Sequence, residues 1–128
     1  MRFGKAASAK GQPKFRNNRV KVDGITFDSQ GEYGRWCSLQ MMEKAGMITE
    51  LHRQVPFELA PAVIIGGRKK PAIRFVSDFA YLHNGALVVE DFKSPITAEE
   101  PVFRLKLHLM KSIWDIDVKI VMDGKRQR

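Results

Sequence analysis

The chain has 128 residues, 44% of them hydrophobic, and a formal net charge of +8. This length suits a single domain with one modest core. No apolar run approaches the roughly 18 residues that a membrane-spanning helix needs, and no apolar segment follows the basic N-terminus as in a secretory signal. These features exclude an integral membrane protein and predict a cytoplasmic one.

Metal sites built from cysteine and histidine are also excluded. A lone Cys37 cannot form an internal disulfide or a zinc site with several thiolates. The three histidines (His52, His83 and His108) lack the spacing of a zinc cluster. We interpret His52 and His108 as ordinary surface or boundary residues.

Basic residues are concentrated at the N-terminus, where residues 1–22 contain seven lysines and arginines and no acid. Residues 1–18 have little apolar content, which predicts a flexible arm, a folded domain at 19–123 and a basic tail at 124–128. Such an arm suits a polyphosphate partner such as DNA, although a solubilising tail is the alternative. The predicted DNA-binding residues are Lys10, Lys14, Arg16, Arg19, Lys21, Arg68, Lys69 and Lys70.

The first predicted elements are a hairpin and a helix. Residues 19–27 alternate around an Asp-Gly turn, as in a small β-hairpin. A helix is predicted to begin at Ser29, which has the capping-box spacing with Glu32, and to stop before Gly46. One broad face of this helix should pack on a sheet through Tyr33, Trp36, Cys37, Leu39, Met41 and Met42.

Extended segments are predicted in the middle of the chain. Residues 48–51 and 55–65 suit strands, with Pro56 and Pro61 favouring edge or irregular positions. Residues 66–71 are predicted to form a basic turn.

The second half of the chain predicts a strand pair, a helix and a last strand. Residues 73–82 and 86–93 should pair through a tight Asn84-Gly85 turn. A helix at 101–114 and a strand at 118–122 follow. We therefore expect an α/β fold with a mixed sheet, and a core stripe on the second helix formed by Phe103, Leu107, Met110 and Trp114.

Two carboxylates and a lysine lie within the most apolar strand pair. Side chains two apart on a strand share a face, so Asp91 and Lys93 point the same way, and the turn brings Asp78 near Asp91. Adjacent like charges destabilise a sheet unless a cation compensates them. Metal-assisted phosphodiester cleavage uses this combination, because carboxylates hold a divalent cation while an ammonium stabilises developing charge. An exposed strand end without function is the alternative.

Glu90 competes with Asp91 for the position of the acid before Lys93. Alternation favours Asp91, because only Asp91 shares the face of Lys93. Glu90 would then pair with a base behind the sheet or support the site from there. A β-bulge at this strand end would reverse the preference.

At these residues the chain resembles the PD-(D/E)xK nuclease superfamily, whose signature is an acid, a variable gap, and then acid-x-Lys on the next strand. Asp78 and Asp91-Phe92-Lys93 match it, with Ser77 in place of the proline of the motif. From about Val20 to Val121 the chain is also similar to small phage and prophage proteins of this superfamily, long catalogued as a domain of unknown function. The segments that carry this similarity are 22–29, Glu32, 54–59, 77–79, 87–93 and 103–106.

The resemblance implies a restriction-endonuclease-like core in αβββαβ order and a Mg²⁺- or Mn²⁺-dependent endodeoxyribonuclease. It implies that Glu32 joins Asp78 and Asp91 as a metal ligand, although the capping box explains Glu32 without a metal. Gln54 and Lys106 match auxiliary polar positions, for which a loop hydrogen bond and a solvated helix flank are the simpler interpretations.

The same resemblance implies structure-selective cleavage of branched, Holliday-junction-like DNA or of recombination and packaging intermediates. It also implies a phage or prophage origin, and a branch-cutting role favours a homodimer. Two alternatives remain open. One is a DNA-binding module that keeps the fold without cleaving, and the other is a packaging accessory protein.

Overall fold

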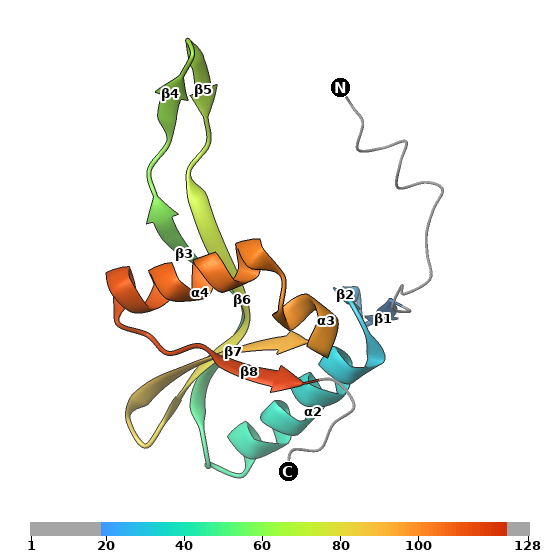
Figure 1. The fold of residues 1–128 in the computed structure, drawn as a ribbon. Helices are drawn as coiled ribbons and strands as arrows, with labels where there is room; N and C mark the ends of the chain where they lie inside the picture. Colours follow the sequence, from blue (N-terminus) through green and yellow to red (C-terminus); the bar gives the residue numbers. More distant parts are fainter. Residues whose placement is uncertain (1–18, 123–128) are drawn as a thin grey trace.

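The computed structural model describes residues 19–122, which form the predicted α/β fold (Figure 1). The predicted arm at 1–18 and tail at 124–128 lie outside the described residues. In chain order the elements are β1 (Val20–Val22), β2 (Ile25–Phe27), α2 (Gln30–Lys44), β3 (Thr49–Ala60), β4 (Val63–Ile65), β5 (Arg68–Lys70), β6 (Ile73–His83), β7 (Ala86–Lys93), α3 (Pro95–Ala98), α4 (Pro101–Trp114) and β8 (Lys119–Met122).

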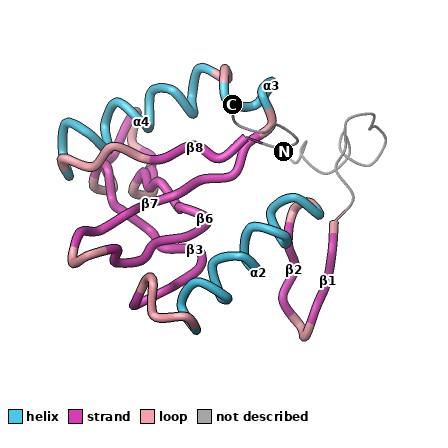
Figure 2. Tube along the Cα trace, turned by 90° about the horizontal axis from the view of Figure 1, so that it is seen from below, coloured by secondary structure: helices cyan, strands magenta, loops and turns pink. Residues whose placement is uncertain are grey.

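A mixed sheet of four strands, in the order β3-β6-β7-β8, forms the centre of the fold. The first two pairings are antiparallel and β8 runs parallel to β7. Helices α2 and α4 cover opposite faces of this sheet (Figure 2). Leu39 of α2 packs with Phe79 on one face, and Phe103 and Met110 of α4 pack with Val89 on the other. The predicted sequence of helix, antiparallel strands, helix and strand is therefore confirmed.

The turn between β6 and β7 has the backbone that the sequence predicts. Asn84 and Gly85 have φ angles of 54° and 80°. Positive φ at both central residues is typical of a type I′ turn, whose twist matches that of the flanking strands. The Asp-Gly turn between β1 and β2 has the same pair of positive φ angles. These two local signals determine the pairing of both hairpins.

The edge strand β3 changes the face to which it contributes at Gln54. Leu51 packs with the cluster beneath α2, whereas Val55, Phe57 and Leu59 pack with the cluster beneath α4. Regular alternation would put all four on one face. Gln54 has a φ of 51°, in the left-handed region that costs a non-glycine residue roughly 1–2 kcal/mol. The backbone at Gln54 therefore shifts the alternation of side chains by one residue. As a result, β3 contributes side chains to the hydrophobic clusters on both faces of the sheet.

Strand β6 changes face at the facing position. Phe75 packs beneath α4 and Phe79 beneath α2, although the two lie an even number of residues apart. The strands β3 and β6 stay in register here, so both change face at the level of Gln54 and Asp78. Asp78 therefore lies at the level where the side chains of β3 and β6 change from one face of the sheet to the other.

Two strand assignments differ from the prediction. Residues 48–51 and 55–60 mostly belong to one continuous strand, β3, which occupies the sheet edge that Pro56 favours. The predicted basic turn at 66–71 is wrong, because Gly66-Gly67 closes a third hairpin in which β5 pairs with β4. Both glycines have positive φ, so the reversal needs only two residues.

The helices also depart from the prediction. The short helix α3 was not predicted, although Ser94 and Thr97 form its capping box. Met41 is 69% exposed and Trp114 45% exposed, so neither belongs to the core. Trp114 instead packs across the sheet edge, where its Nε1–H donates to the Glu58 carbonyl at 3.0 Å. No helix in residues 19–122 is long and apolar enough to cross a membrane.

Candidate functional site

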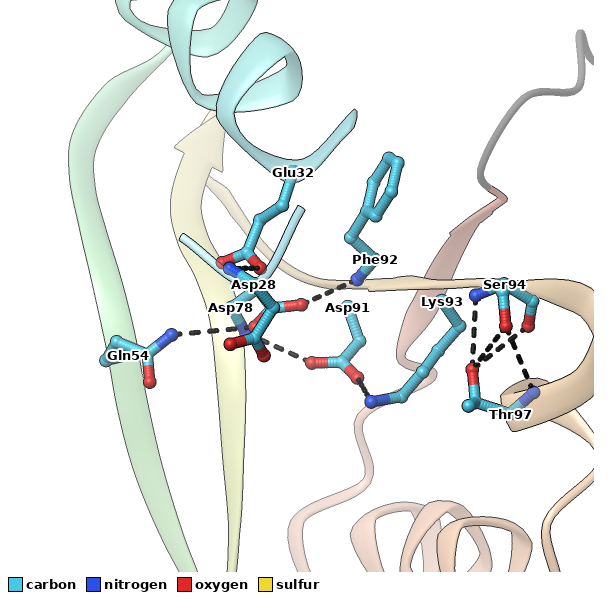
Figure 3. A network of polar contacts seen from close by, with 9 residues as sticks. All are labelled: Asp28, Glu32, Gln54, Asp78, Asp91, Phe92, Lys93, Ser94 and Thr97. Carbon is cyan, nitrogen blue, oxygen red and sulfur yellow. Dashed lines mark hydrogen bonds and ion pairs between the residues drawn. The ribbon is translucent and has the colours of Figure 1, made fainter. Parts of the chain in front are cut away.

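Asp78 and Asp91 lie side by side on β6 and β7, as the predicted turn requires (Figure 3). The Asp78 backbone N–H donates to Asp91 Oδ1 at 3.1 Å, and the Phe92 N–H donates to Asp78 Oδ2 at 2.7 Å. Each carboxylate thus accepts a backbone N–H from the strand of the other. These bonds orient both carboxylates through the sheet itself.

Lys93 follows Asp91 on the same face of β7, as the alternation predicts. Its Nζ is 3.1 Å from Asp91 Oδ2 and lies over the Phe103 ring, 4.8 Å from the centroid. The Lys93 side chain is 29% exposed, whereas that of Asp91 is 3% exposed. The Lys93 ammonium group therefore lies between the buried Asp91 carboxylate and solvent.

Glu32 adds a third carboxylate from the first turn of α2. It is 4% exposed, and its Oε1 accepts the Asp28 N–H at 3.3 Å. The Ser29 hydroxyl accepts the Glu32 N–H at 3.1 Å. The predicted capping box is therefore only half formed, because the Glu32 carboxylate binds the N–H of Asp28 instead of that of Ser29.

Burial raises the pKa of all three carboxylates, and the charge of Asp91 adds to the shift at Asp78 and Glu32. Burial and then the charges of Asp91 and Glu32 raise the pKa of Asp78 to about 7. Burial also raises the pKa of Asp91, against the opposing charge of Lys93, and it raises the pKa of Glu32. Shifts of this kind mark sites that bind cations or transfer protons, although structural networks also produce them.

Two cavities meet at these residues. Glu32, Asp78 and Lys93 line a cavity of about 140 Å³, and Asp91 and Lys93 line one of about 380 Å³. Thr97 of α3 also lines both. The cavities are thus two parts of one cleft between the start of α2 and the helices α3 and α4, and the three carboxylates and the ammonium line it.

Glu90 lies on the opposite face of β7, at 0% exposure. Arg35 of α2 donates to both of its oxygens, at 2.9 and 2.6 Å, and the Tyr81 hydroxyl also donates to it. Burial opposes ionisation, but the bonds from Arg35 and Tyr81 outweigh it and lower the pKa of Glu90. The geometric prediction is confirmed: Asp91 faces Lys93, and Glu90 pairs with a base behind the sheet.

Residues 12–124 match the model of a family described as "Protein of unknown function (DUF1064)". The chain belongs to this family. No curated protein matches it. The match spans every element from β1 to β8, so the whole cleft lies within the part of the chain that is typical of DUF1064.

Gln54 and Lys106, which were predicted as auxiliary polar residues of this DUF1064 chain, lie differently: Gln54 contacts Asp78, and Lys106 lines the larger cavity. Gln54 Nε2 donates to Asp78 Oδ1 at 3.5 Å from within β3, so the expected loop position is wrong. Lys106 is half-buried and lines the larger cavity with Asp91 and Lys93, so it is not a fully solvated helix flank.

Sequence reasoning missed Arg35, Tyr81 and Thr97. Arg35 follows Glu32 by one helical turn, which could have placed both on one side of α2. The Ser-x-x-Thr spacing at the start of α3 could have predicted Thr97. No local signal identifies the bond of Tyr81 to Glu90, because it depends on how the strands pack under α2.

Five of the eight predicted DNA-binding cations lie in the described part of the chain, at two places. Arg68, Lys69 and Lys70 are exposed along β5, while Arg19 and Lys21 are exposed at β1. The other three, Lys10, Lys14 and Arg16, lie outside the described residues.

The carboxylates fit a divalent cation by their chemistry but do not form a ready-made site. Among residues 19–122, no three His, Cys, Asp or Glu side chains are arranged to hold a metal ion. Ligation by all three carboxylates therefore requires side chains to rotate, while Asp91 keeps Lys93 and Glu32 keeps the Asp28 N–H as present partners. A cation would compensate the burial and the neighbouring negative charges that raise the pKa of Asp78, and an oxygen-only donor set suits Mg²⁺ or Mn²⁺.

Proposed function

We propose that this DUF1064 protein is a divalent-metal-dependent endonuclease of the PD-(D/E)xK type that hydrolyses DNA phosphodiester bonds. The observation that carries the proposal is the contact of Asp78 with Asp91 and of Asp91 with Lys93, in a cleft that also contains Glu32. Carboxylates this deeply buried require compensation by positive charge. Lys93 beside Asp91 and Arg53 near Glu32 supply two such charges for three carboxylates, which leaves an electrostatic preference for a further cation.

In this proposal Glu32, Asp78 and Asp91 would hold Mg²⁺ or Mn²⁺, and the bound cation would supply a water of lowered pKa and neutralise phosphate charge. Lys93 stabilises the negative charge that develops on the phosphate in the transition state. Gln54 orients Asp78 through its amide. The low exposure of Asp91 strengthens each of these electrostatic contributions, because water screens them less.

Several further features belong to the same proposal. The basic arm and the Arg68–Lys70 strand contact the DNA backbone, so recognition is by DNA shape rather than by sequence. The substrates are branched recombination or packaging intermediates, cut by a homodimer in the cytoplasm of a bacterial host that carries the phage or prophage gene. These features rest on the resemblance and on the basic charge of the chain.

The Asp91→Asn variant tests the proposed chemistry. Cleavage of labelled branched and duplex DNA with Mg²⁺ should fall by about 10²–10⁴-fold, because a cation ligand and the partner of Lys93 are lost. Binding should be unchanged or tighter, since one negative charge is removed. The matched control is Asp117→Asn, at an 84% exposed side chain. Wild-type-like cleavage by the Asp91 variant would refute the mechanism.

A second candidate function is a DNA-binding protein of the same fold that does not cleave. It is favoured by the observation that no three His, Cys, Asp or Glu side chains of the described residues are arranged to hold a metal ion. This function predicts DNA binding that chelators leave unchanged, and no nicking of supercoiled plasmid with Mg²⁺ or Mn²⁺. Metal-dependent nicking that the Asp91→Asn variant loses would exclude it.

A further inference from the structure

The β4–β5 hairpin is a two-stranded ribbon that stands away from the body of the protein (Figure 1). Every residue from 61 to 70 is exposed. Strand β4 presents three large aliphatic side chains to solvent, with Val63, Ile64 and Ile65 at 46%, 72% and 61% exposure. Contiguous exposed aliphatic residues usually mark a surface that meets a partner.

The charge of this region indicates the chemistry of the partner. Residues 59–77 contain Arg68, Lys69, Lys70 and Arg74 and no acidic residue. Arg74, at the base of the ribbon, also lines the larger cavity beside Asp91. Arg74 is paired with Glu58 of β3, so the net positive charge of this region lies on Arg68, Lys69 and Lys70 of the ribbon, where it favours a polyanion that also passes the cleft.

The two faces of the ribbon distinguish between polyanions. Residues paired across an antiparallel ribbon share a face. Ile64 pairs with Lys69, so this pair occupies one face. The pairs Val63 with Lys70 and Ile65 with Arg68 occupy the other face. Each face therefore carries both aliphatic and cationic side chains.

A flat anionic surface, whether a protein or a membrane, would contact only one of these faces. A nucleic-acid groove has phosphates on both sides and bases at its floor. The major groove of B-form DNA is wide enough to admit a two-stranded β-ribbon. The major groove of A-form RNA is too narrow and deep for side chains to enter.

We propose that the β4–β5 ribbon is a groove-binding arm for B-form duplex DNA, which it holds beside the carboxylate cleft. Arg68 and Lys70 contact the phosphates on one side of the groove and Lys69 those on the other. The aliphatic β4 side chains lie within the groove and have no hydrogen-bonding groups with which to read the base sequence. The inference rests on the proposed function and narrows its substrate to DNA that has a duplex segment next to the cut. Single-stranded DNA and duplex RNA are poorer ligands.

The test compares two triple variants of the full chain that lose the same number of positive charges. One carries Arg68→Gln, Lys69→Gln and Lys70→Gln in the ribbon. The control carries Lys44→Gln, Arg104→Gln and Lys111→Gln on the exposed surfaces of α2 and α4. Binding to labelled duplex DNA, single-stranded DNA and duplex RNA is measured by fluorescence anisotropy in EDTA over a range of salt concentrations.

The ribbon variant should bind duplex DNA at least about 10-fold more weakly, and the slope of log K against log[salt] should fall by about 2–3. The control should change affinity less than about 3-fold. Ile64→Ser with Ile65→Ser should weaken duplex binding without changing the salt slope, since no charge is lost. Unchanged sedimentation of each variant shows that the ribbon is not an interface between copies of the chain.

Equal behaviour of the two triple variants, or tighter binding of duplex RNA than of duplex DNA, would overturn the proposal. Loss of self-association in the Ile64 and Ile65 variant would assign the ribbon to a second copy instead. Because binding is measured without metal, the outcome is separate from cleavage. If the ribbon variant loses DNA binding but the wild type does not cleave DNA, only the proposed nuclease activity is refuted. If the wild type cleaves DNA and the ribbon substitutions leave binding and cleavage unchanged, only the ribbon proposal is refuted.

Discussion

Replacing Asp78 with asparagine is expected to stabilise the metal-free protein at neutral pH. Burial and the charges of Asp91 and Glu32 raise the pKa of Asp78 from 3.8 to about 7, so the folded state disfavours the ionised side chain. Asparagine keeps the shape and removes the charge. Its carbonyl oxygen can still accept the Phe92 N–H, which binds Asp78 Oδ2 at 2.7 Å. The substitution therefore removes repulsion while it retains the bond between strands.

The size and sign of the effect follow from proton linkage. Between pH 4 and 7 the folded protein holds a proton on Asp78 that the unfolded chain has released, so the free energy of unfolding falls as pH rises. At 1.36 kcal/mol per pKa unit, a shift from 3.8 to about 7 has a ceiling of about 4 kcal/mol. Asp78 is partly exposed and shares its repulsion with Asp91, so we expect a gain of about 1–3 kcal/mol.

Urea unfolding in EDTA, followed by tryptophan fluorescence at pH 4, 6 and 7.5, measures this gain. The Asp78→Asn variant should match the wild type at about pH 4 and exceed it increasingly up to pH 7.5. The control Asp117→Asn, at an exposed side chain, should stay within about 0.5 kcal/mol of the wild type at each pH. Millimolar Mg²⁺ should stabilise the wild type more than the Asp78 variant.

A pH-independent difference, or an Asp78 variant that is less stable than the wild type at pH 7.5, would refute this reasoning. Either result would mean that the carboxylate is adequately compensated without a cation. In that case Asp78 would be a structural residue, and the repulsion among the three carboxylates could not be used to infer a metal site.

Two further predictions concern the structure around the cleft. Arg35→Met should destabilise the fold by about 3–5 kcal/mol in urea unfolding, because it leaves the buried carboxylate of Glu90 without the guanidinium that binds both of its oxygens. Adding Glu90→Gln to Arg35→Met should recover part of this loss, and an Arg35→Met variant of wild-type stability would contradict the assigned role. Ser29→Ala should cost about 1 kcal/mol, since the hydroxyl accepts the Glu32 N–H at the start of α2; a change below about 0.3 kcal/mol would show that this cap contributes little.

Local signals in the sequence were sufficient to predict the strand pair that carries the site. The Asn84-Gly85 turn needs positive φ at two positions, which few residue pairs tolerate, so the register of β6 and β7 is determined by a short segment. Strict alternation then places Asp91 with Lys93 and Glu90 on the opposite face. Both relations depend on residues close together in the chain, and the structure confirms both of them.

Contacts between distant segments were decided by the tertiary structure. The approach of Glu32 to Asp78 depends on how α2 packs on the sheet, and the Arg35–Glu90 pair joins residues 55 positions apart. The left-handed backbone at Gln54 runs against local preference, and packing on both faces of β3 compensates its strain. The sequence by itself therefore determined the Asp23-Gly24 and Asn84-Gly85 turns, the alternation along β7 and the order of the main helices and sheet strands, because these follow from short-range backbone preferences. Only the tertiary structure decided that carboxylates from a helix and two strands line one cleft, because that requires burial of both faces of the sheet at once.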